Sequence, residues 1–199
     1  VDEFGSEVSS NTKGYLIIKN PWPGMLLTLW GDDEKYKNVY WSKYPNCYYP
    51  GDYALKDSDG YLWLLGRADD ILKIAGHRIG TAELESCIVS DCAVAESAVC
   101  GIPDEIKGEA IIVFAVLKDG VTTDKNILEK NLFNKIRIDI GPIATPKQIY
   151  FVSKLPKTRS GKIMRRLLKS IASGEKIGDT STLDDPSAVT EIQKIITKN

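Results

Sequence analysis

Apolar and polar positions change their spacing close to residue 70 of the chain. Before it, aromatic residues alternate with turn residues, and two short β runs stand out, at residues 15–19 and 61–66. After it, strand-like apolar runs at 94–102 and 110–117 alternate with segments in which apolar residues recur at helical spacing. The second run is uninterrupted, which predicts a central strand covered on both faces.

Two helices are predicted from residues that can cap a first turn, Thr81 and Asp124. Their apolar faces consist of Leu84, Cys87 and Ile88 in the first helix, and Leu128, Leu132 and Ile136 in the second. Gly141-Pro142 ends the second helix. A further amphipathic helix is predicted after residue 162, whereas residues 173–199 are polar with one weak amphipathic turn. The predicted fold class is therefore α/β (α+β), with a short central sheet flanked by helices and preceded by a β-rich segment.

Composition and charge exclude several classes of protein. The chain is 43% hydrophobic and 27% charged, which is ordinary for a globular protein. Its net charge of -1 provides no overall field that would attract nucleic acid or an anionic membrane. No apolar run reaches the roughly 18 residues that span a bilayer. The start of the chain lacks both the pattern of a signal peptide and an initiator Met, so we expect a piece of a longer protein.

The cysteine and histidine content argues against structural disulfides and against some classes of metal site. The four cysteines show no CxxC spacing, and a chain of this length does not need disulfides to fold, which indicates reduced thiols and a cytoplasmic location. His77 is the single histidine, so multi-histidine metal sites are excluded.

The first candidate functional segment is the turn Tyr48-Tyr49-Pro50-Gly51-Asp52. A carboxylate on a tight turn can accept two hydrogen bonds from a ribose diol, as acidic residues do in nucleotide sites. Taken alone, the motif is more typical of a solvated turn aspartate, because short motifs match by chance.

The second candidate is residues 66–80, where charged residues and three glycines lie between apolar anchors. Arg67 and Arg78 are forked donors suited to phosphate or ribose oxygens, and glycines let the backbone approach a ligand. A β-hairpin at a domain boundary is the simpler interpretation. It does not explain why Asp69 and Asp70 crowd the same boundary.

The third candidate is residues 154–169, which contain seven basic residues and no acidic one. Lys162 follows a glycine in a loop, and a lysine there can reach a reacting phosphoryl group and withdraw afterwards. An RNA-binding module is one alternative, and a solvated basic face is another. RNA binding would favour aromatic residues within the stretch for base stacking, and none follows Tyr150-Phe151.

In this order and spacing, the three segments resemble the late motifs of the acyl-adenylate-forming superfamily. This superfamily includes acyl-CoA synthetases, luciferases and the adenylation domains of peptide synthetases. Further segments resemble the acetyl-CoA synthetase branch, so that the resemblance covers essentially the whole chain. They are Trp22-Pro23-Gly24, residues 28–32, residues 76–83, residues 140–146 and residues 178–183.

The resemblance implies a domain organisation and a reaction. Residues 1–68 would end the large N-terminal adenylate-forming domain, 69–172 would form a mobile C-terminal domain with its hinge at Asp69, and 173–199 would be a C-terminal tail. The family joins acetate, ATP and CoA into acetyl-CoA, AMP and pyrophosphate through acetyl-AMP, by alternation between two domain orientations. Mg²⁺ would accompany ATP. The phosphate loop and the acyl pocket lie upstream in the family, so we expect an acid–thiol ligase whose piece seen here is inactive without the N-terminal domain.

The resemblance also implies a role for individual residues. Lys162 matches the catalytic lysine of adenylation and is a plausible acetylation site for a deacetylase partner. The ATP-binding residues would be Asp52, Arg67 and Arg78, and the CoA-binding residues would be Ala75, Gly76 and Arg137. A structural metal site would comprise Asp91 with the carbonyl groups of Val89 and Val94, and a carboxylate suits a hard cation. Pro50, Ala75 and Asp91 depart from the usual family residues Thr, Ser and His.

Two alternatives within the superfamily stay open. The acid is implied by the branch alone, so a synthetase for propionate or another short acid is an alternative. A carrier-protein-loading adenylation domain is the other, and residues 178–183 argue against it. A nuclear or organellar pool beside the cytoplasmic one is also left open, and neither nucleic acid nor membrane is an expected partner.

Overall fold

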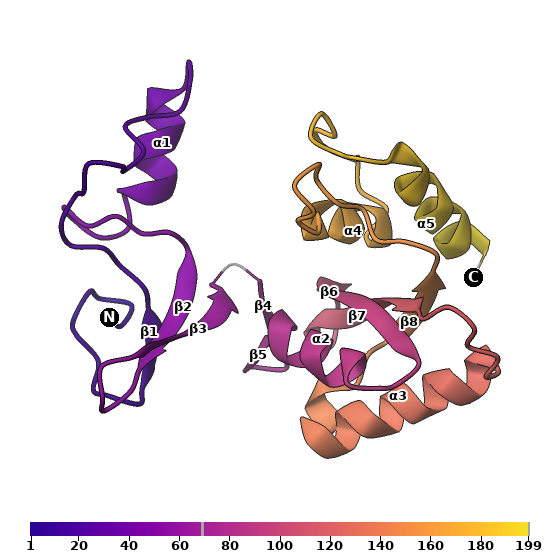
Figure 1. The fold of residues 1–199 in the computed structure, drawn as a ribbon. Coiled ribbons are helices and arrows are strands. Elements are labelled where there is room, and N and C mark those ends of the chain that lie inside the picture. The colour runs from indigo at the N-terminus through magenta and orange to yellow at the C-terminus, as the bar shows by residue number, and fades with distance from the viewer. Residues whose placement is uncertain (69, 199) are drawn as a thin grey trace. The chain divides into compact units, whose positions relative to one another are not determined.

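The chain divides into two compact units, Val1–Asp70 and Ile71–Asn199 (Figure 1). The computed structural model describes residues 1–68 and 70–198. Two β-sheets and five α-helices make up these residues, which confirms the predicted mixed α/β class. None of the helices described is both long and apolar enough to cross a membrane.

The first unit contains a three-stranded antiparallel sheet in the order β1-β2-β3. Its strands are β1 (Lys13–Tyr15), β2 (Asp52–Lys56) and β3 (Leu62–Arg67). The unit also contains helix α1 (Asp33–Tyr40), where the aromatic pattern had predicted irregular, β-rich structure. The helix forms because the side chain of Asp32 accepts a hydrogen bond from the Lys35 N–H (3.0 Å), and two acidic residues in its first turn complement its dipole.

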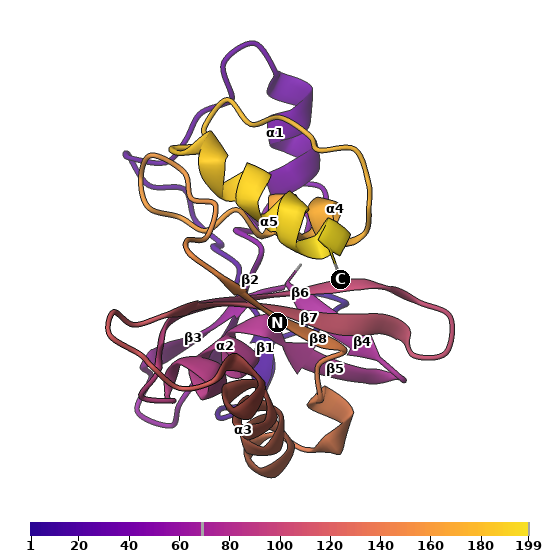
Figure 2. The ribbon, with the colours of Figure 1, turned by 90° about the vertical axis from the view of Figure 1, so that its right-hand side faces the viewer.

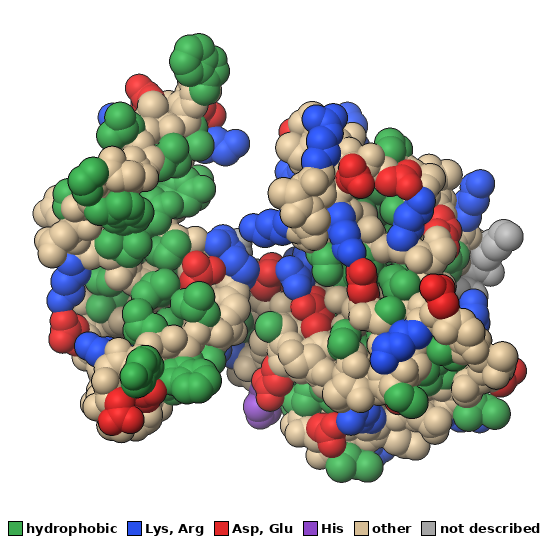
Figure 3. Space-filling view, in the orientation of Figure 1, with side chains coloured by type: hydrophobic (Ala, Val, Ile, Leu, Met, Phe, Trp, Pro, Cys, Tyr) green, Lys and Arg blue, Asp and Glu red, His purple; other side chains and the backbone are tan. Residues whose placement is uncertain are grey.

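Strand β3 leaves large apolar side chains exposed. Leu62, Trp63 and Leu64 are 59%, 60% and 69% exposed, although successive residues of a strand point to opposite faces. Trp30 and Leu27, elsewhere in the same unit, are also almost fully exposed. In Figure 3 hydrophobic side chains cover much of this unit's visible surface. Exposed apolar patches of this kind are typical of surfaces that contact another protein segment, a membrane or a ligand.

The second unit is built on a five-stranded sheet. Its strands are β4 (Ile71–Ile74), β5 (His77–Gly80), β6 (Val94–Asp104), β7 (Gly108–Leu117) and β8 (Gln148–Val152). The order β5-β4-β7-β6 is antiparallel throughout. Strand β8 runs parallel to the second half of β7.

Helices cover both faces of this sheet (Figure 2). On one face lie α2 (Thr81–Val89) and α3 (Lys125–Asp139), and on the other lie α4 (Arg165–Ala172) and α5 (Pro186–Lys198). A short 3-10 helix, η1 (Pro142–Ala144), follows α3. Strand β7 contributes to both cores in alternation: Ile111, Val113 and Ala115 pack toward α2 and α3, and Ile112 and Phe114 toward α4 and α5. The prediction of a doubly covered central strand is therefore confirmed.

The helix ends agree with the sequence pattern at α3 and differ at α2 and α5. Asp124 caps α3 by accepting from the N–H groups of Asn126 (2.8 Å) and Ile127 (3.3 Å). Thr81, predicted as a cap, is instead the first residue of α2, because Gly80 is still in the extended conformation of β5. The predicted weak turn near the C-terminus is a helix of 13 residues, α5, and Ile192 is fully buried against the sheet.

Asp185 connects the start of α5 to the segment that follows β8, and this contact leads us to expect that stability falls in acid. Its carboxylate pairs with Lys154 and accepts a hydrogen bond from the Ser187 N–H (2.8 Å). The hydrogen bond from Lys154 has the larger effect and those from Ser187 a smaller one, and together they lower the pKa of Asp185 to about 2. Because the folded pKa lies below the ordinary one, this contribution is present above pH ~4 and is lost as pH falls toward ~2. In urea titrations at pH 5 and pH 3, Asp185→Asn should lose less stability between the two pH values than the parent. Asp119→Asn, at an exposed turn, is the control; equal pH dependence of all three proteins would contradict the assignment.

Candidate functional site

The turn before β2 brings two predicted nucleotide-binding residues together. The β2–β3 register places Asp52 opposite Arg67, and the Arg67 Nη1 lies 3.6 Å from the Asp52 Oδ1. The same Nη1 donates to the backbone carbonyl of Pro50 (2.7 Å). Gly51 makes this arrangement possible: its φ is +87°, and a Cβ at this position would lie 2.6 Å from the Arg67 Nη2. The guanidinium group therefore lies against a bare glycine.

Aromatic rings hold the chain that leads into this turn. Tyr48 stacks on Tyr40 with ring centroids 5.2 Å apart and an interplanar angle of 8°, and Trp41 packs edge-on against Tyr48. The backbone of Tyr48 also exchanges hydrogen bonds with Ile18 (2.9 and 3.0 Å). Burial, more than any neighbouring charge, raises the pKa of Tyr48. Asp52 thus follows a rigid segment, although the turn itself is only partly buried.

The second candidate segment forms a β-hairpin, in which β4 and β5 are joined by a two-residue turn. Ile74 pairs with His77 across the turn, and the two turn residues both have positive φ, +46° at Ala75 and +84° at Gly76. Positive φ at both central positions is the geometry of a type I′ turn. The Ala75 N–H donates to the Lys107 carbonyl (2.8 Å), which ties the turn to the start of β7. Arg78 is exposed on β5, in register with Lys73.

Ala75 is a strained choice for this turn, so Ala75→Asn should stabilise the unit. A left-handed conformation costs an ordinary L-residue about 1–2 kcal/mol, and Asn-Gly is a preferred pair in type I′ turns. We expect the free energy of unfolding to rise by about 0.5–1 kcal/mol, measured by urea titration. Gly76→Ala is the matched control, because a Cβ there meets no atom within 4 Å and adds only conformational strain. That variant should be less stable than the parent; a loss of stability in Ala75→Asn would contradict the argument.

Lys162 lies on the loop of residues 157–163, referred to below as the lysine loop. Lys157 and Ile163 form an isolated antiparallel bridge at its base. Inside it, the Thr158 N–H donates to the Lys162 carbonyl (2.8 Å), and the Lys162 N–H donates to the Thr158 Oγ1 (3.1 Å). Gly161 completes the turn with φ +83°. The backbone of Lys162 is thus fixed while its side chain is exposed.

Most of the basic residues in the third segment have anionic partners. The pairs are Lys154 with Asp185, Lys157 with Glu96 (2.7 Å), Arg165 with Glu85 (2.6 Å) and Lys169 with Glu109 (3.5 Å). Arg166 donates to the Asp179 carbonyl (2.8 Å). Within the described residues, only the side chains of Arg159 and Lys162, of the seven, have neither a carboxylate nor a carbonyl partner. Acidic and basic side chains are accordingly interspersed on this unit in Figure 3, which does not favour a nucleic-acid surface.

The predicted CoA-binding residue Arg137 and the predicted metal-coordinating residues show fewer supporting contacts. Arg137 is exposed in the last turn of α3. The Asp91 Oδ1 accepts from the Ala93 N–H (2.9 Å), so the predicted metal set offers one partly engaged carboxylate and backbone carbonyls. No cluster of three or more His, Cys, Asp or Glu side chains occurs in the part of the chain that is described, where all four cysteines are free. The metal site at Val89, Asp91 and Val94 therefore stays a prediction.

The predicted site residues fall into both units. Asp52 and Arg67 belong to the first, and the hairpin, Arg137 and Lys162 to the second. Asp69, the predicted hinge, lies outside the described residues. The domain boundaries implied by the resemblance therefore stay a prediction.

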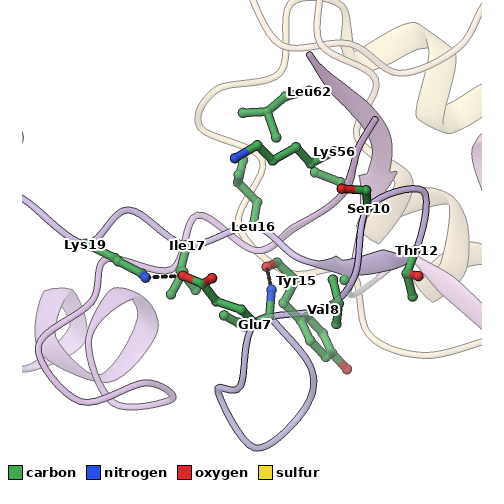
Figure 4. Close-up of a pocket in the computed structure, with 13 residues that line it drawn as sticks. Glu7, Val8, Ser10, Thr12, Tyr15, Leu16, Ile17, Lys19, Lys56 and Leu62 are labelled. Carbon is green, nitrogen blue, oxygen red and sulfur yellow. Dashed lines mark hydrogen bonds and ion pairs between the residues drawn. The ribbon is translucent and has the colours of Figure 1, made fainter. Parts of the chain in front are cut away.

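The first unit also contains a hollow with a volume of about 370 Å³. It is lined by the N-terminal loop, β1 and the segment after it, and by residues of β2 and β3, and Lys19 pairs with Glu7 among the lining residues (Figure 4). None of the predicted ATP-binding, CoA-binding or catalytic residues lines it.

Comparison with known proteins identifies relatives over nearly the whole chain. Residues 83–162 match the family model of the AMP-binding enzyme C-terminal domain. The chain is 60% identical to an acetyl-coenzyme A synthetase of Pyrobaculum arsenaticum over 98% of its length, and 48% identical to that of Chlorobaculum tepidum over 98%. It is 47% identical to a 3-hydroxypropionyl-coenzyme A synthetase of Metallosphaera sedula, again over 98%. The chain spans 29%, 29% and 30% of these three proteins.

Solved structures agree with this relationship. An acetoacetyl-CoA synthetase from Streptomyces lividans superposes with a TM-score of 0.83 at 24% identity, covering 99% of this chain and 30% of that one. ATP-bound MatB from Rhodopseudomonas palustris gives 0.73 at 26% identity, covering 86% and 32%. Residues 83–162 therefore belong to the family of AMP-binding enzyme C-terminal domains, and the chain as a whole is similar to part of the curated acetyl-coenzyme A synthetases.

Proposed function

We propose that the full-length protein is an AMP-forming acetate–CoA ligase, and that this chain contributes one side of its active site. The observation that carries the proposal is Lys162, an exposed cation on a backbone-fixed loop whose basic neighbours are mostly neutralised by carboxylates. The 60% identity to a curated acetyl-coenzyme A synthetase over 98% of the chain supports the reaction and its substrates, ATP and CoA.

The first half-reaction joins acetate to ATP. A carboxylate oxygen of acetate attacks the α-phosphorus, the bond from that phosphorus to the bridging oxygen breaks, and pyrophosphate leaves with the electron pair. Lys162 would stabilise the negative charge that spreads over the acetate and α-phosphate oxygens in the transition state. Asp52 would accept hydrogen bonds from the ribose hydroxyls, and Arg67 and Arg78 would donate to the nucleotide. Mg²⁺ bound to ATP would supply additional charge neutralisation.

The second half-reaction transfers the acetyl group to CoA. The thiolate attacks the acetyl carbonyl carbon, the bond to the phosphate oxygen breaks, and AMP is released. The hairpin would run beside the CoA thiol arm at Ala75 and Gly76, with Arg137 contacting CoA. Rotation about Asp69 would exchange the lysine loop for the hairpin between the two steps.

The proposal also includes partners and location. The exposed apolar side chains of β3 fit a surface that packs on the rest of a larger N-terminal domain. The exposure of Lys162 suits it to acetylation, which would remove its charge, and to a deacetylase that restores it. A cytoplasmic location completes the proposal.

A second short acid is the alternative, because a relative acting on 3-hydroxypropionate is 47% identical over 98% of the chain. The test is CoA thioester formation by the full-length enzyme with acetate, propionate and 3-hydroxypropionate. Acetate should give the highest kcat/KM; absence of thioester with all three acids would overturn the proposal. Residues 1–199 alone should support no acetate-dependent exchange of pyrophosphate into ATP.

A further inference from the structure

The ion pair between Glu85 and Arg165 joins two helices 80 residues apart in the sequence. Arg165 Nε donates to the Glu85 Oε1 (2.9 Å), and its Nη2 donates to the Oε2 (2.6 Å), so the contact is bidentate. The two side chains are 13% exposed at Glu85 and 27% at Arg165. The Glu85 Oε1 also accepts from the Val99 N–H (2.9 Å), which fixes the carboxylate on the sheet.

This pair lies at one end of the lysine loop. Arg165 is the first residue of α4 and follows Lys162 by three positions. Met164, the N-cap of α4, makes no side-chain capping bond, and the first turn contains no acidic residue. A basic first turn opposes the helix dipole, and the Glu85 carboxylate supplies the missing negative charge. The first turn of α4 is thus stabilised by a carboxylate of α2 instead of by a cap within its own sequence.

The other end of the loop is held by a weaker contact. Lys157 pairs with Glu96 of β6 at 2.7 Å. The side chain of Lys157 is 34% exposed and that of Glu96 is 41% exposed. An exposed ammonium contact of this kind, made by one nitrogen atom to both oxygens of Glu96, contributes little, whereas a forked guanidinium contact fixes direction as well as distance. Glu85 therefore makes the stronger of the two ion-pair contacts at the ends of the lysine loop, whose backbone also bonds to Thr182 and Asp184.

Glu85 also belongs to the helix that leads directly out of the hairpin. Helix α2 begins at Thr81, immediately after β5 ends at Gly80. The Ser97 Oγ donates to the Glu85 carbonyl (3.1 Å), so α2 is fastened to β6 at the same residue. One side chain thus connects the lysine loop to the element that bears the hairpin.

We propose that Glu85 and Arg165 are positioning residues for Lys162. They fix the lysine loop on the α2–β6 framework, so that the Lys162 amine is presented in one place during adenylation. The inference rests on the proposed function for the role of Lys162. The hairpin is attached to β7 through its own backbone and does not depend on the pair. Loss of the pair should therefore impair adenylation and leave thioester formation intact.

The experiment compares Arg165→Met with the parent in the full-length enzyme. Acetate-dependent pyrophosphate exchange should fall about tenfold or more in kcat, because displacing a catalytic group by an ångström has effects of this size, while the KM for ATP changes less than about twofold. Thioester formation from supplied acetyl-AMP should also stay within about twofold. Arg165→Lys, which keeps the charge without the fork, should restore only part of the exchange rate.

Lys169→Met is the matched control, because it removes a cation paired with Glu109 from the same helix, away from the lysine loop. Hydrogen–deuterium exchange gives a readout independent of activity: Arg165→Met should speed exchange in residues 158–164, and Lys169→Met should not. If Arg165→Met does not fold, Glu85→Gln, whose amide oxygen can still accept from Val99, takes its place.

The outcomes separate the two hypotheses. The positioning role would be overturned if Arg165→Met lost both half-reactions equally. It would also be overturned if Arg165→Met changed neither the rate of pyrophosphate exchange nor the deuterium uptake of the lysine loop. A parent enzyme that lacks acetate-dependent exchange would instead defeat the proposed function, and the deuterium uptake would still decide whether Arg165 holds the loop.

Discussion

Replacing Lys162 by Ala should lower the rate of acetyl-AMP formation about a hundredfold to a thousandfold, which corresponds to about 3–4 kcal/mol of transition-state stabilisation. The Lys162 N–H and carbonyl both bond to Thr158, so the backbone of the loop does not depend on the side chain. The exposed side chain of Lys162 can therefore be removed without opening a cavity. The measurement is pyrophosphate exchange in the full-length enzyme, beside thioester formation from supplied acetyl-AMP, which should be spared.

Arg159→Ala is the matched control for this experiment. Arg159 is exposed in the same loop, and its side chain, like that of Lys162, has no carboxylate or carbonyl partner within the described residues. If general positive charge drew ATP to the loop, both variants would weaken exchange to a similar degree. If Lys162 acts on the reacting phosphate, Arg159→Ala should retain most of the activity. Loss of both half-reactions in Lys162→Ala would show that the lysine is not specific to adenylation.

The architecture of the second unit could be predicted where the signal is local. The uninterrupted apolar run at 110–117 predicts β7 as the central strand, and Asp124 with Gly141 predicts the limits of α3. Helix α5 was underestimated because its buried residues, among them Val189 and Ile192, are few and separated by polar positions. Its stability comes from packing on strands distant in sequence, which no local pattern records.

Helix α1 was missed for a related reason. Only Tyr36 is buried among its eight residues, and its apolar stripe is short, limited to Tyr36, Val39 and Tyr40. The signal that does predict it is Asp32 before two acidic residues, a capping pattern that the surrounding aromatic residues obscured.

In the candidate site, too, the sequence predicts individual residues but not the contacts between segments that are distant along the chain. Residue types and spacing single out Asp52, Arg67 and Lys162, and the structure places the first two 3.6 Å apart; their roles stay predictions. The sequence does not show that Arg67 rests on Gly51, or that Glu85 holds Arg165. Both contacts join segments separated by other elements, so they depend on the register of the sheet and the packing of helices upon it.

The contact between Gly51 and Arg67 leads to the second large expected effect. Gly51→Ala introduces a Cβ 2.6 Å from the Arg67 Nη2, and the flexible guanidinium group must move away. It would lose its bond to the Pro50 carbonyl and its position beside Asp52. A hydrogen bond involving a charged group contributes about 1.5–3 kcal/mol, so the KM for ATP should rise about tenfold to a hundredfold.

Gly60→Ala separates this effect from backbone strain. Gly60 lies in the turn between β2 and β3 with φ +91°, close to the +87° of Gly51, and a Cβ there meets no atom within 4 Å. Both variants should therefore lose a similar stability, about 1–2 kcal/mol, from the left-handed conformation. The KM for ATP of the full-length enzyme should rise in Gly51→Ala alone, because only that substitution displaces Arg67. An equal rise in both variants would mean that strain in the β2–β3 sheet, and not the placement of the guanidinium group, controls nucleotide binding.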